Sequence, residues 1–222
     1  MTAAMSDSDQ AAFLRLNTAI ASPPLVPEIR LHLASEITPI WQASEQALAA
    51  ANVDPPFWAF AWPGGQALAR HILDHPALVA GQSVLDFGAG SGLVAIAAAL
   101  AGASPVLAAD IDPMAIAAIK QNARLNRVSI ETSPCDPVDG PGFWPVVLAA
   151  DMFYEREPSL RFSAWFKRLA ERGALVLIGE PGRDYRPRLD LEARARLVVP
   201  TSLELEDRLE RVVDIWRVRR LA

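Results

Sequence analysis

The chain contains a glycine-rich turn between two apolar stretches. Residues 84–92 read VLDFGAGSG, and LVAIA follows at 93–97. The pattern predicts a buried strand, a sharp turn and the first turns of a helix. Glycines at alternate positions let the backbone approach a ligand closely, and the free amide N–H groups of the helix start point toward the same space. The turn is therefore the candidate ligand cradle of the chain.

Two acidic residues suggest which ligand the cradle takes. Asp110 ends a second apolar run and can hold a pair of ribose hydroxyls. Residues 90–95 (GSGLVA) also fit the relaxed dinucleotide pattern G-x-G-x-x-A, so NAD is one candidate. Asp86 favours another, because a carboxylate repels a pyrophosphate but attracts a ligand with an ammonium and a sulfonium, as in S-adenosylmethionine. The alternative for Asp86 is a turn or helix-capping residue.

Composition and charge limit the class of protein. The chain has 222 residues, 51% of them hydrophobic, which is enough for a sizeable core. The net charge of −5 argues against a general binder of nucleic acid or membrane surfaces. Acidic residues are interleaved with a late group of arginines, so this group is expected to form a solvated face. These arginines are Arg183, Arg186, Arg188, Arg194 and Arg196.

Neither a metal centre nor a membrane span is expected. Cys135 is the only cysteine, which excludes an intrachain disulfide and suits a reducing cytoplasm. The three histidines show no ligand spacing, and the first ten residues resemble neither a secretory signal nor a transit peptide. Gly102 and Pro105 divide the apolar region 93–109 into a helix and a strand. We therefore expect a cytoplasmic protein.

From residue 82 onward, short apolar strands alternate with helices. The predicted strands are 83–87, 104–109, 128–132, 145–150 and 174–179, and the predicted helices are 92–101, 113–126 and 156–172. This alternation is typical of a mostly parallel sheet with helices on both faces. Two β-branched runs at 196–205 and 212–219 predict an antiparallel hairpin at the sheet edge. The expected class is α/β, with a Rossmann-like seven-stranded sheet.

Residues 1–65 are predicted to form an extension that packs on a domain at 66–222. A helix is expected at 11–21, a half-exposed strand at 28–33, and a second helix starting at Thr38. The loop at 54–65 is too aromatic for an ordinary linker. Its Trp and Phe side chains either pack into the core or line a site.

A second candidate segment, DMFY at 151–154, directly follows the predicted strand 145–150. Ligands of open parallel sheets bind outside the carboxyl ends of the strands, so DMFY should lie over the same crevice as the glycine turn. A turn with a helix cap explains the segment equally well.

Five segments, taken in order, resemble the seven-strand methyltransferases that modify lysines of the electron-transfer flavoprotein beta subunit. They are residues 56–66 (PFWAFAWPGGQ), 86–92 (DFGAGSG), 110–113 (DIDP), 151–154 (DMFY) and 178–183 (IGEPGR). The glycine motif is common to a whole superfamily, whereas WPGGQ and DMFY together are more specific. The resemblance implies the class I methyltransferase fold and S-adenosylmethionine as the cofactor. It makes the flavoprotein subunit the first candidate partner and a ribosomal stalk protein a second, with no nucleic acid or membrane partner.

The resemblance also implies roles for individual residues. The implied cofactor-binding residues are Asp86, Gly88, Gly90, Gly92, Asp110 and Ile111, with Trp62 bordering the cofactor and Asp136 at the adenine. Asp151 and Tyr154 are implied at the acceptor amine. Residues 133–137 are proline-rich and depart from the family's pattern at the adenine side.

Elementary chemistry is consistent with these roles. Methyl transfer requires a neutral amine lone pair, so a lysine of pKa about 10.4 must first lose a proton. A carboxylate stabilises the ammonium, so Asp151 is expected to orient the amine rather than to act as a strong base. Trp58 and Phe153 are expected to contribute apolar walls for the substrate. Methylation of a small amine, NAD-dependent oxidation and ligand binding without catalysis are the alternatives.

Overall fold

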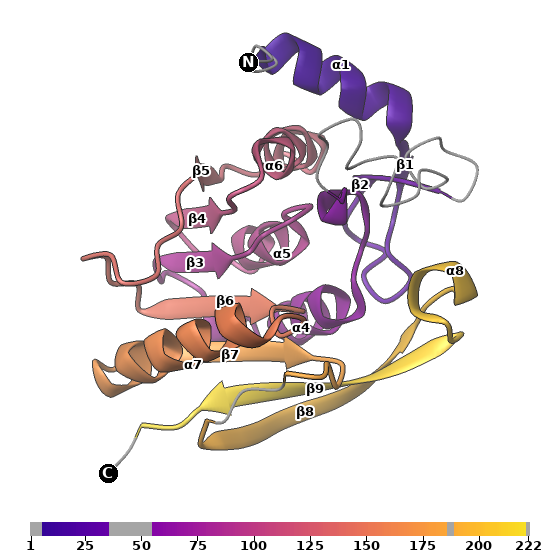
Figure 1. Cartoon of the computed structure of the whole chain (residues 1–222). Helices are drawn as coiled ribbons and strands as arrows, with labels where there is room; N and C mark the ends of the chain where they lie inside the picture. Colours follow the sequence, from indigo (N-terminus) through magenta and orange to yellow (C-terminus); the bar gives the residue numbers. More distant parts are fainter. Residues whose placement is uncertain (1–5, 36–54, 186–188, 221–222) are drawn as a thin grey trace.

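A computed structural model describes residues 6–35, 55–185 and 189–220 of the chain. Its centre is a seven-stranded sheet in the order β5–β4–β3–β6–β7–β9–β8 (Figure 1). Five strands are parallel: β3 (Val84–Phe87), β4 (Val106–Ala109), β5 (Glu131–Ser133), β6 (Val146–Ala150) and β7 (Leu175–Glu180). β9 (Glu210–Val218) runs antiparallel to β7 and pairs with β8 (Leu191–Pro200). The predicted seven-stranded α/β fold with a C-terminal antiparallel hairpin is confirmed.

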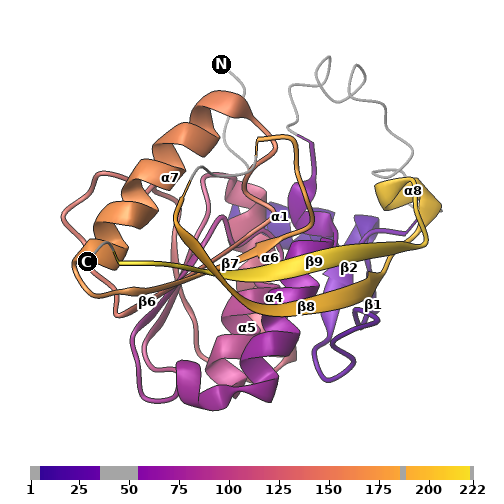
Figure 2. The ribbon, with the colours of Figure 1, turned by 90° about the horizontal axis from the view of Figure 1, so that it is seen from below.

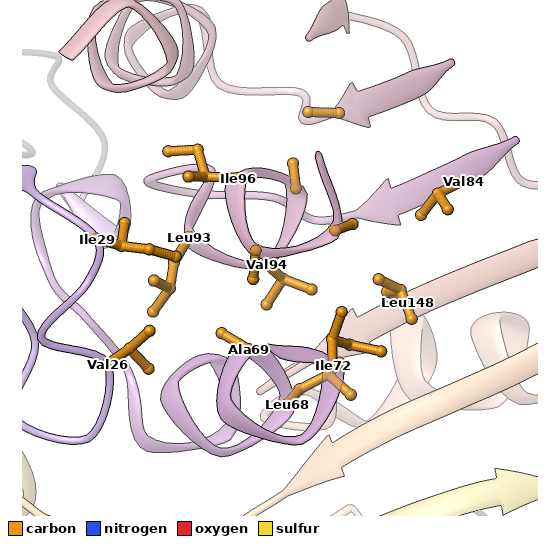
Figure 3. Packing of buried hydrophobic residues seen from close by; sticks show 14 of the residues in the cluster. Val26, Ile29, Leu68, Ala69, Ile72, Val84, Leu93, Val94, Ile96 and Leu148 are labelled. Carbon is orange, nitrogen blue, oxygen red and sulfur yellow. The ribbon is translucent and has the colours of Figure 1, made fainter. Parts of the chain in front are cut away.

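Helices cover both faces of this sheet. α4 (Pro63–Asp74), α5 (Leu93–Leu100) and α6 (Pro113–Leu125) lie on one face, and α7 (Arg156–Glu171) lies on the other (Figure 2). Side chains from α4 and α5 interleave with those of β3 and β6 in the larger core, as Figure 3 shows for Leu68, Ile72 and Leu148. α5 is apolar throughout because it lies between the sheet and α4, with most of its residues buried.

The N-terminal segment differs from its predicted boundaries. α1 (Asp7–Asn17) begins earlier than expected because the Ser6 side chain accepts the Asp9 N–H and caps it. β1 (Ala19–Ala21) then pairs with β2 (Leu31–Leu33), which is shorter than the predicted strand because the preceding residues form turns. The helix expected from Thr38 lies outside the described residues. α4 crosses the predicted boundary between residues 65 and 66.

The C-terminal hairpin also has different bounds from those predicted. β8 ends at Pro200, earlier than the predicted run, and a short helix α8 (Leu203–Glu206) follows it. The Ser202 side chain caps α8 by accepting the Leu205 N–H. The tip of the hairpin is thus a helical turn that carries Glu206. No helix in the described part of the chain is both long and apolar enough to cross a membrane.

Candidate active site

The glycine turn adopts a backbone that only glycine accommodates easily. Gly88, Gly90 and Gly92 have φ angles of 66°, 52° and 79°. A Cβ on Gly88 would collide with the Met152 side chain, and one on Gly92 would lie 3.2 Å from Ile119 Cγ1. The space around Gly90 is open, with the nearest heavy atom 3.9 Å from its ideal Cβ. Gly88 and Gly92 therefore permit close packing, while Gly90 leaves the cradle free.

Asp86 caps helix α5 and faces the cradle at the same time. The N-cap residue Gly92 has no side chain, and Asp86 Oδ2 instead accepts the Ala95 N–H at 2.8 Å. The residue is 2% exposed, and burial raises the pKa of its carboxyl to about 7, with the Asp110 charge raising it further and the Ala95 amide opposing. Asp86 is thus a helix-capping residue, and it also lines the cavity at the glycine turn.

Asp110 fixes the glycine turn from the end of the neighbouring strand. Its Oδ2 accepts the Gly90 N–H at 2.8 Å, and its Oδ1 accepts the Asp112 N–H at 3.0 Å. Burial raises the pKa of this carboxyl, and these backbone N–H groups lower it. Ile111 follows with 74% of its surface exposed. Carboxylate oxygens have capacity for further donors, so ribose hydroxyls remain compatible with this geometry.

One cavity joins the glycine turn to the DMFY segment. It is lined by the turn, by the start of α5, by Phe60, Trp62 and Gly65, and by Asp151 at the carboxyl end of β6. The crevice expected above the ends of the strands is therefore present, with Asp86 and Asp151 both in its wall. In the described part of the chain, no group of three His, Cys, Asp or Glu side chains is arranged to hold a metal ion.

The Asp151 carboxylate is held in place on both oxygens. Oδ2 accepts the Gly65 N–H at 3.0 Å, and Oδ1 lies 3.0 Å from Arg183 Nη2. Its side chain is 10% exposed. Burial raises its pKa to about 6, although Arg183 and the Gly65 amide lower it. The backbone φ of 56° is unusual for a non-glycine residue and typical of functional positions.

Two glycines explain how α4 reaches this carboxylate. An ideal Cβ on Gly64 would lie 2.5 Å from Asp151 Oδ2 and 2.6 Å from the Gly179 carbonyl oxygen. Gly179, near the end of β7, would meet the Gly64 backbone in the same way. The absent side chains let the N-terminus of α4 approach the sheet, so its amide dipoles point at Asp151. This is the structural role of Gly64, the first glycine of the Gly-Gly pair in the aromatic loop, and of Gly179 in β7.

Arg183 belongs to this site, which corrects its expected place on a solvated face. Its guanidinium bridges Asp151 and Glu206, with 2.7 and 3.2 Å between its nitrogens and the two Glu206 oxygens. Glu206 also accepts from Arg211 Nε at 2.8 Å, and its side chain is 1% exposed. The position of Arg183 just after β7 and its place in the family-like segment 178–183 pointed toward the site. Spacing in the sequence could not show its partner, because Glu206 comes from the hairpin tip.

The aromatic residues Phe60 and Trp62 line the cavity, whereas Phe57 and Tyr154 lie outside its lining. Trp62 Nε1 donates to the Phe57 carbonyl at 2.8 Å, and its ring lies 5.8 Å from the Arg183 guanidinium carbon. Tyr154 is 49% exposed and its ring centroid lies 5.7 Å from that of Phe57. Burial, then the Glu155 and Asp110 charges, raise the pKa of Tyr154, so its hydroxyl keeps its proton.

Trp58, Phe153 and Asp136 are among the expected site residues that do not line the cavity. Trp58 is 2% exposed and packs with Leu14 below α6, and Phe153 is fully buried against Phe166 in the core under α7. Their rings are enclosed, so neither can form a substrate wall. Asp136 is turned toward α7, where Oδ2 pairs with Arg161 and Oδ1 accepts the Val138 N–H. The aromatic loop thus contributes to both the core and the site.

Solved structures of methyltransferases share this fold. A putative RNA methyltransferase from Pyrococcus horikoshii aligns with a TM-score of 0.57 and 17% identity, over 81% of this chain and 100% of that one. A ribosomal protein L11 methylase from Lactobacillus delbrueckii aligns with a TM-score of 0.53 and 23% identity, over 73% and 81% of the two chains. The fold and the cradle define a class I S-adenosylmethionine-dependent methyltransferase, and S-adenosylmethionine is its cofactor.

Sequence relatives identify the family. The electron transfer flavoprotein beta subunit lysine methyltransferase of Xenopus laevis is 41% identical to this chain, and the alignment covers 78% of this chain and 70% of the relative. That of Homo sapiens is 40% identical, over 89% of this chain and 76% of the relative. That of Danio rerio is 37% identical over 96% of this chain and 84% of its own length. Residues 67–141 match the family described as ribosomal protein L11 methyltransferase (PrmA). The chain belongs to the electron transfer flavoprotein beta subunit lysine methyltransferase family.

The geometry of the cradle suits this cofactor. The first amides of α5 have no intrahelical acceptor, the buried Asp86 carboxylate precedes the turn, and the partly buried Asp110 carboxylate contacts its middle glycine, Gly90. Carboxylates suit the ammonium, sulfonium and ribose hydroxyls of S-adenosylmethionine better than a pyrophosphate. The alternative of an NAD-dependent oxidoreductase is therefore set aside.

We expect cofactor affinity to depend on pH through Asp86. Its pKa of about 7 means that a bound cation favours loss of its proton. In the wild type, we expect the affinity for S-adenosylmethionine to fall about tenfold from pH 8 to pH 6. The Asp86→Asn variant should show a clearly smaller change over the same range. Isothermal titration calorimetry of both proteins measures this difference. Parallel pH dependences in the two proteins would contradict a role for the Asp86 proton.

Proposed function

We propose that the enzyme methylates lysine side chains of the electron transfer flavoprotein beta subunit. The observation that carries the proposal is the shared cavity, because Asp151 stands in the same wall as the cofactor cradle. An amine held at Asp151 would then lie next to the methyl donor. The relatives that bear the name of this activity cover most of the chain, including residue 151 in the alignment with the longest coverage.

The residues of the site divide the work of the reaction. S-adenosylmethionine supplies an electrophilic methyl group: the amine lone pair forms the N–C bond, the C–S bond breaks, and its electron pair stays on sulfur. Asp151 accepts a hydrogen bond from the amine N–H and so directs the lone pair. The half-exposed rings of Phe57 and Tyr154 form an apolar rim that suits the aliphatic stem of a lysine. We propose the cytoplasm as the compartment, which suits the single free Cys135.

A ribosomal stalk protein is a second candidate substrate. The support is the match to the ribosomal protein L11 methyltransferase family, but this match ends at residue 141, before the DMFY segment. It therefore covers the cofactor half of the site and not the acceptor half. A small amine is a third candidate, because nothing in Asp151 chemistry alone requires a protein.

Labelled methyl transfer distinguishes these substrates. Purified enzyme and deuteromethyl-labelled cofactor are given to three acceptors separately: the flavoprotein heterodimer, the ribosomal stalk protein and a low-mass amine fraction. We expect label on lysines of the beta subunit, at a rate at least about tenfold above the other two. Peptide mass spectrometry maps the lysines and counts the methyl groups. Preferential label on the stalk protein or in the low-mass fraction would contradict the proposal.

A further inference from the structure

A carboxylate beside an acceptor amine creates a conflict. It orients the amine, but its charge also favours the ammonium form, which has no lone pair to react. Arg183 lies on the other side of this carboxylate, with Nη2 3.0 Å from Asp151 Oδ1. A fixed cation at this distance reduces the negative potential that an entering lysine meets.

Arg183 is itself firmly held. Glu180 Oε1 accepts the backbone N–H groups of Gly182 and Arg183 at 2.8 and 2.6 Å, which fixes the loop after β7. Glu206 binds the guanidinium through both of its oxygens, and Arg211 pairs with Glu206 from β9. The result is a charge row of alternating acidic and basic side chains, Asp151, Arg183, Glu206 and Arg211.

We propose that Arg183 is a positioning residue that offsets the charge of Asp151, so that the acceptor lysine is bound as the neutral amine. The inference rests on the proposed lysine methylation. The lysine gives its proton to water as it enters the site, before the methyl group is transferred. Asp151 thus keeps its directing hydrogen bond, while the ammonium form gains little from it.

Other titratable groups surround this pair. Glu180 is 3% exposed and interacts with Asp151, Glu206 lies behind Arg183, and Asp86 faces the same cavity from β3. Each of them carries or can carry negative charge. Arg183 is the cation that contacts Asp151 directly among the described residues.

The charge row predicts pH shifts of opposite sign for two variants. Removing the cation in Arg183→Gln should move the pH dependence of kcat to higher pH by about one unit, with about tenfold slower transfer below the shifted midpoint. KM should not rise, because the ammonium form binds at least as well. Glu206→Gln removes a negative charge behind Arg183 and should shift the midpoint to lower pH. Arg183→Lys keeps the charge and should stay near the wild-type midpoint.

Proton release on binding provides a readout that needs no catalysis. A peptide containing the labelled lysine is titrated into enzyme saturated with S-adenosylhomocysteine at pH 7.5, in buffers of different ionisation enthalpy. Wild-type enzyme should release close to one proton per peptide, because the free lysine is charged and the bound one is neutral. Arg183→Gln should release clearly less, and a peptide with glutamine in place of the lysine should release none.

Arg196→Gln is the matched control. Arg196 forms a two-point ion pair with Asp214 on the hairpin that also carries Glu206. It is solvent-exposed and does not line the cavity. It should change neither the pH midpoint nor proton release. If Arg183→Gln loses rate equally at every pH, or releases as many protons as the wild type, the proposal is overturned. Failure of the proposed function would appear differently, as wild-type enzyme that labels no protein lysine.

Discussion

We expect the Asp151→Asn variant to lose methyl transfer by about a hundredfold or more in kcat, because the carboxylate orients the acceptor amine. Cofactor affinity should stay within about threefold, since the carboxylates expected at the cofactor, Asp86 and Asp110, are unchanged in this variant. Asparagine is the suitable replacement because it tolerates the left-handed backbone at this position. Single-turnover transfer and cofactor titration measure the two quantities.

The same variant should change how stability depends on pH. Burial raises the pKa of Asp151 from 3.8 to about 6 in the folded protein. The folded state therefore holds the proton more tightly than the unfolded state. Ionisation of Asp151 lowers the free energy of unfolding: this loss is zero below the unfolded pKa, grows as the pH rises, and is complete above about pH 6. Relative to the wild type, Asp151→Asn should gain about 1 kcal/mol between pH 5 and pH 7. Chemical denaturation at the two pH values measures this.

Asp139→Asn is the control for the transfer experiment. Asp139 also has a left-handed backbone, with φ of 65°, but its side chain is 56% exposed and pairs with arginines of α7. It should retain full transfer, because Asp139 lies on α7's side of the sheet and not in the cavity wall. Undiminished transfer by Asp151→Asn would remove Asp151 from the proposed mechanism.

Gly64→Ala should damage both stability and catalysis. Its Cβ would lie 2.6 Å from the Gly179 carbonyl oxygen and 2.5 Å from Asp151 Oδ2, and a backbone atom cannot move aside cheaply. We expect a loss of about 1–3 kcal/mol in unfolding free energy. Displacement of Asp151 from the α4 amides should lower kcat about a hundredfold. Denaturant unfolding and transfer assays test the two effects separately.

The neighbouring glycine offers a close comparison. A Cβ on Gly65 would meet only Leu93 Cδ2, at 3.9 Å, which is ordinary contact. Alanine is also a better helix former than glycine, so Gly65→Ala should leave the unfolding free energy unchanged or slightly raised. Equal destabilisation by the two substitutions would mean that close approach of α4 to β7 is not what requires Gly64.

Local patterns in the sequence predicted most of the sheet. The strands β3, β4 and β6 are short apolar runs, and a turn and a helix follow each of them, as at residues 84–100. The hairpin was harder, because Pro200 and the Ser202 cap end β8 inside a run that looked continuous. Propensity in that run did not distinguish a strand from a helical turn.

The sequence predicted the site residues at strand ends, but not the contacts that depend on how distant segments pack together. Asp86, Asp110 and Asp151 stand at strand ends, which a sequence reveals directly. Burial of an aromatic ring depends on what packs over it, and the structure buries the rings of Trp58 and Phe153, which were expected to face the substrate. The pairing of Arg183 with Glu206 joins residues brought together only by the antiparallel return of the last strands.

The position of Glu206 at the hairpin tip imposes an order on synthesis of the enzyme. The cradle is complete once residues up to Asp110 and their neighbouring strands have left the ribosome, but Glu206 and Arg211 are translated late. A nascent chain that has already formed its parallel strands still lacks the support for Arg183. The ion pairs that hold Arg183 beside Asp151 can therefore form only after the last strands of the sheet have been made.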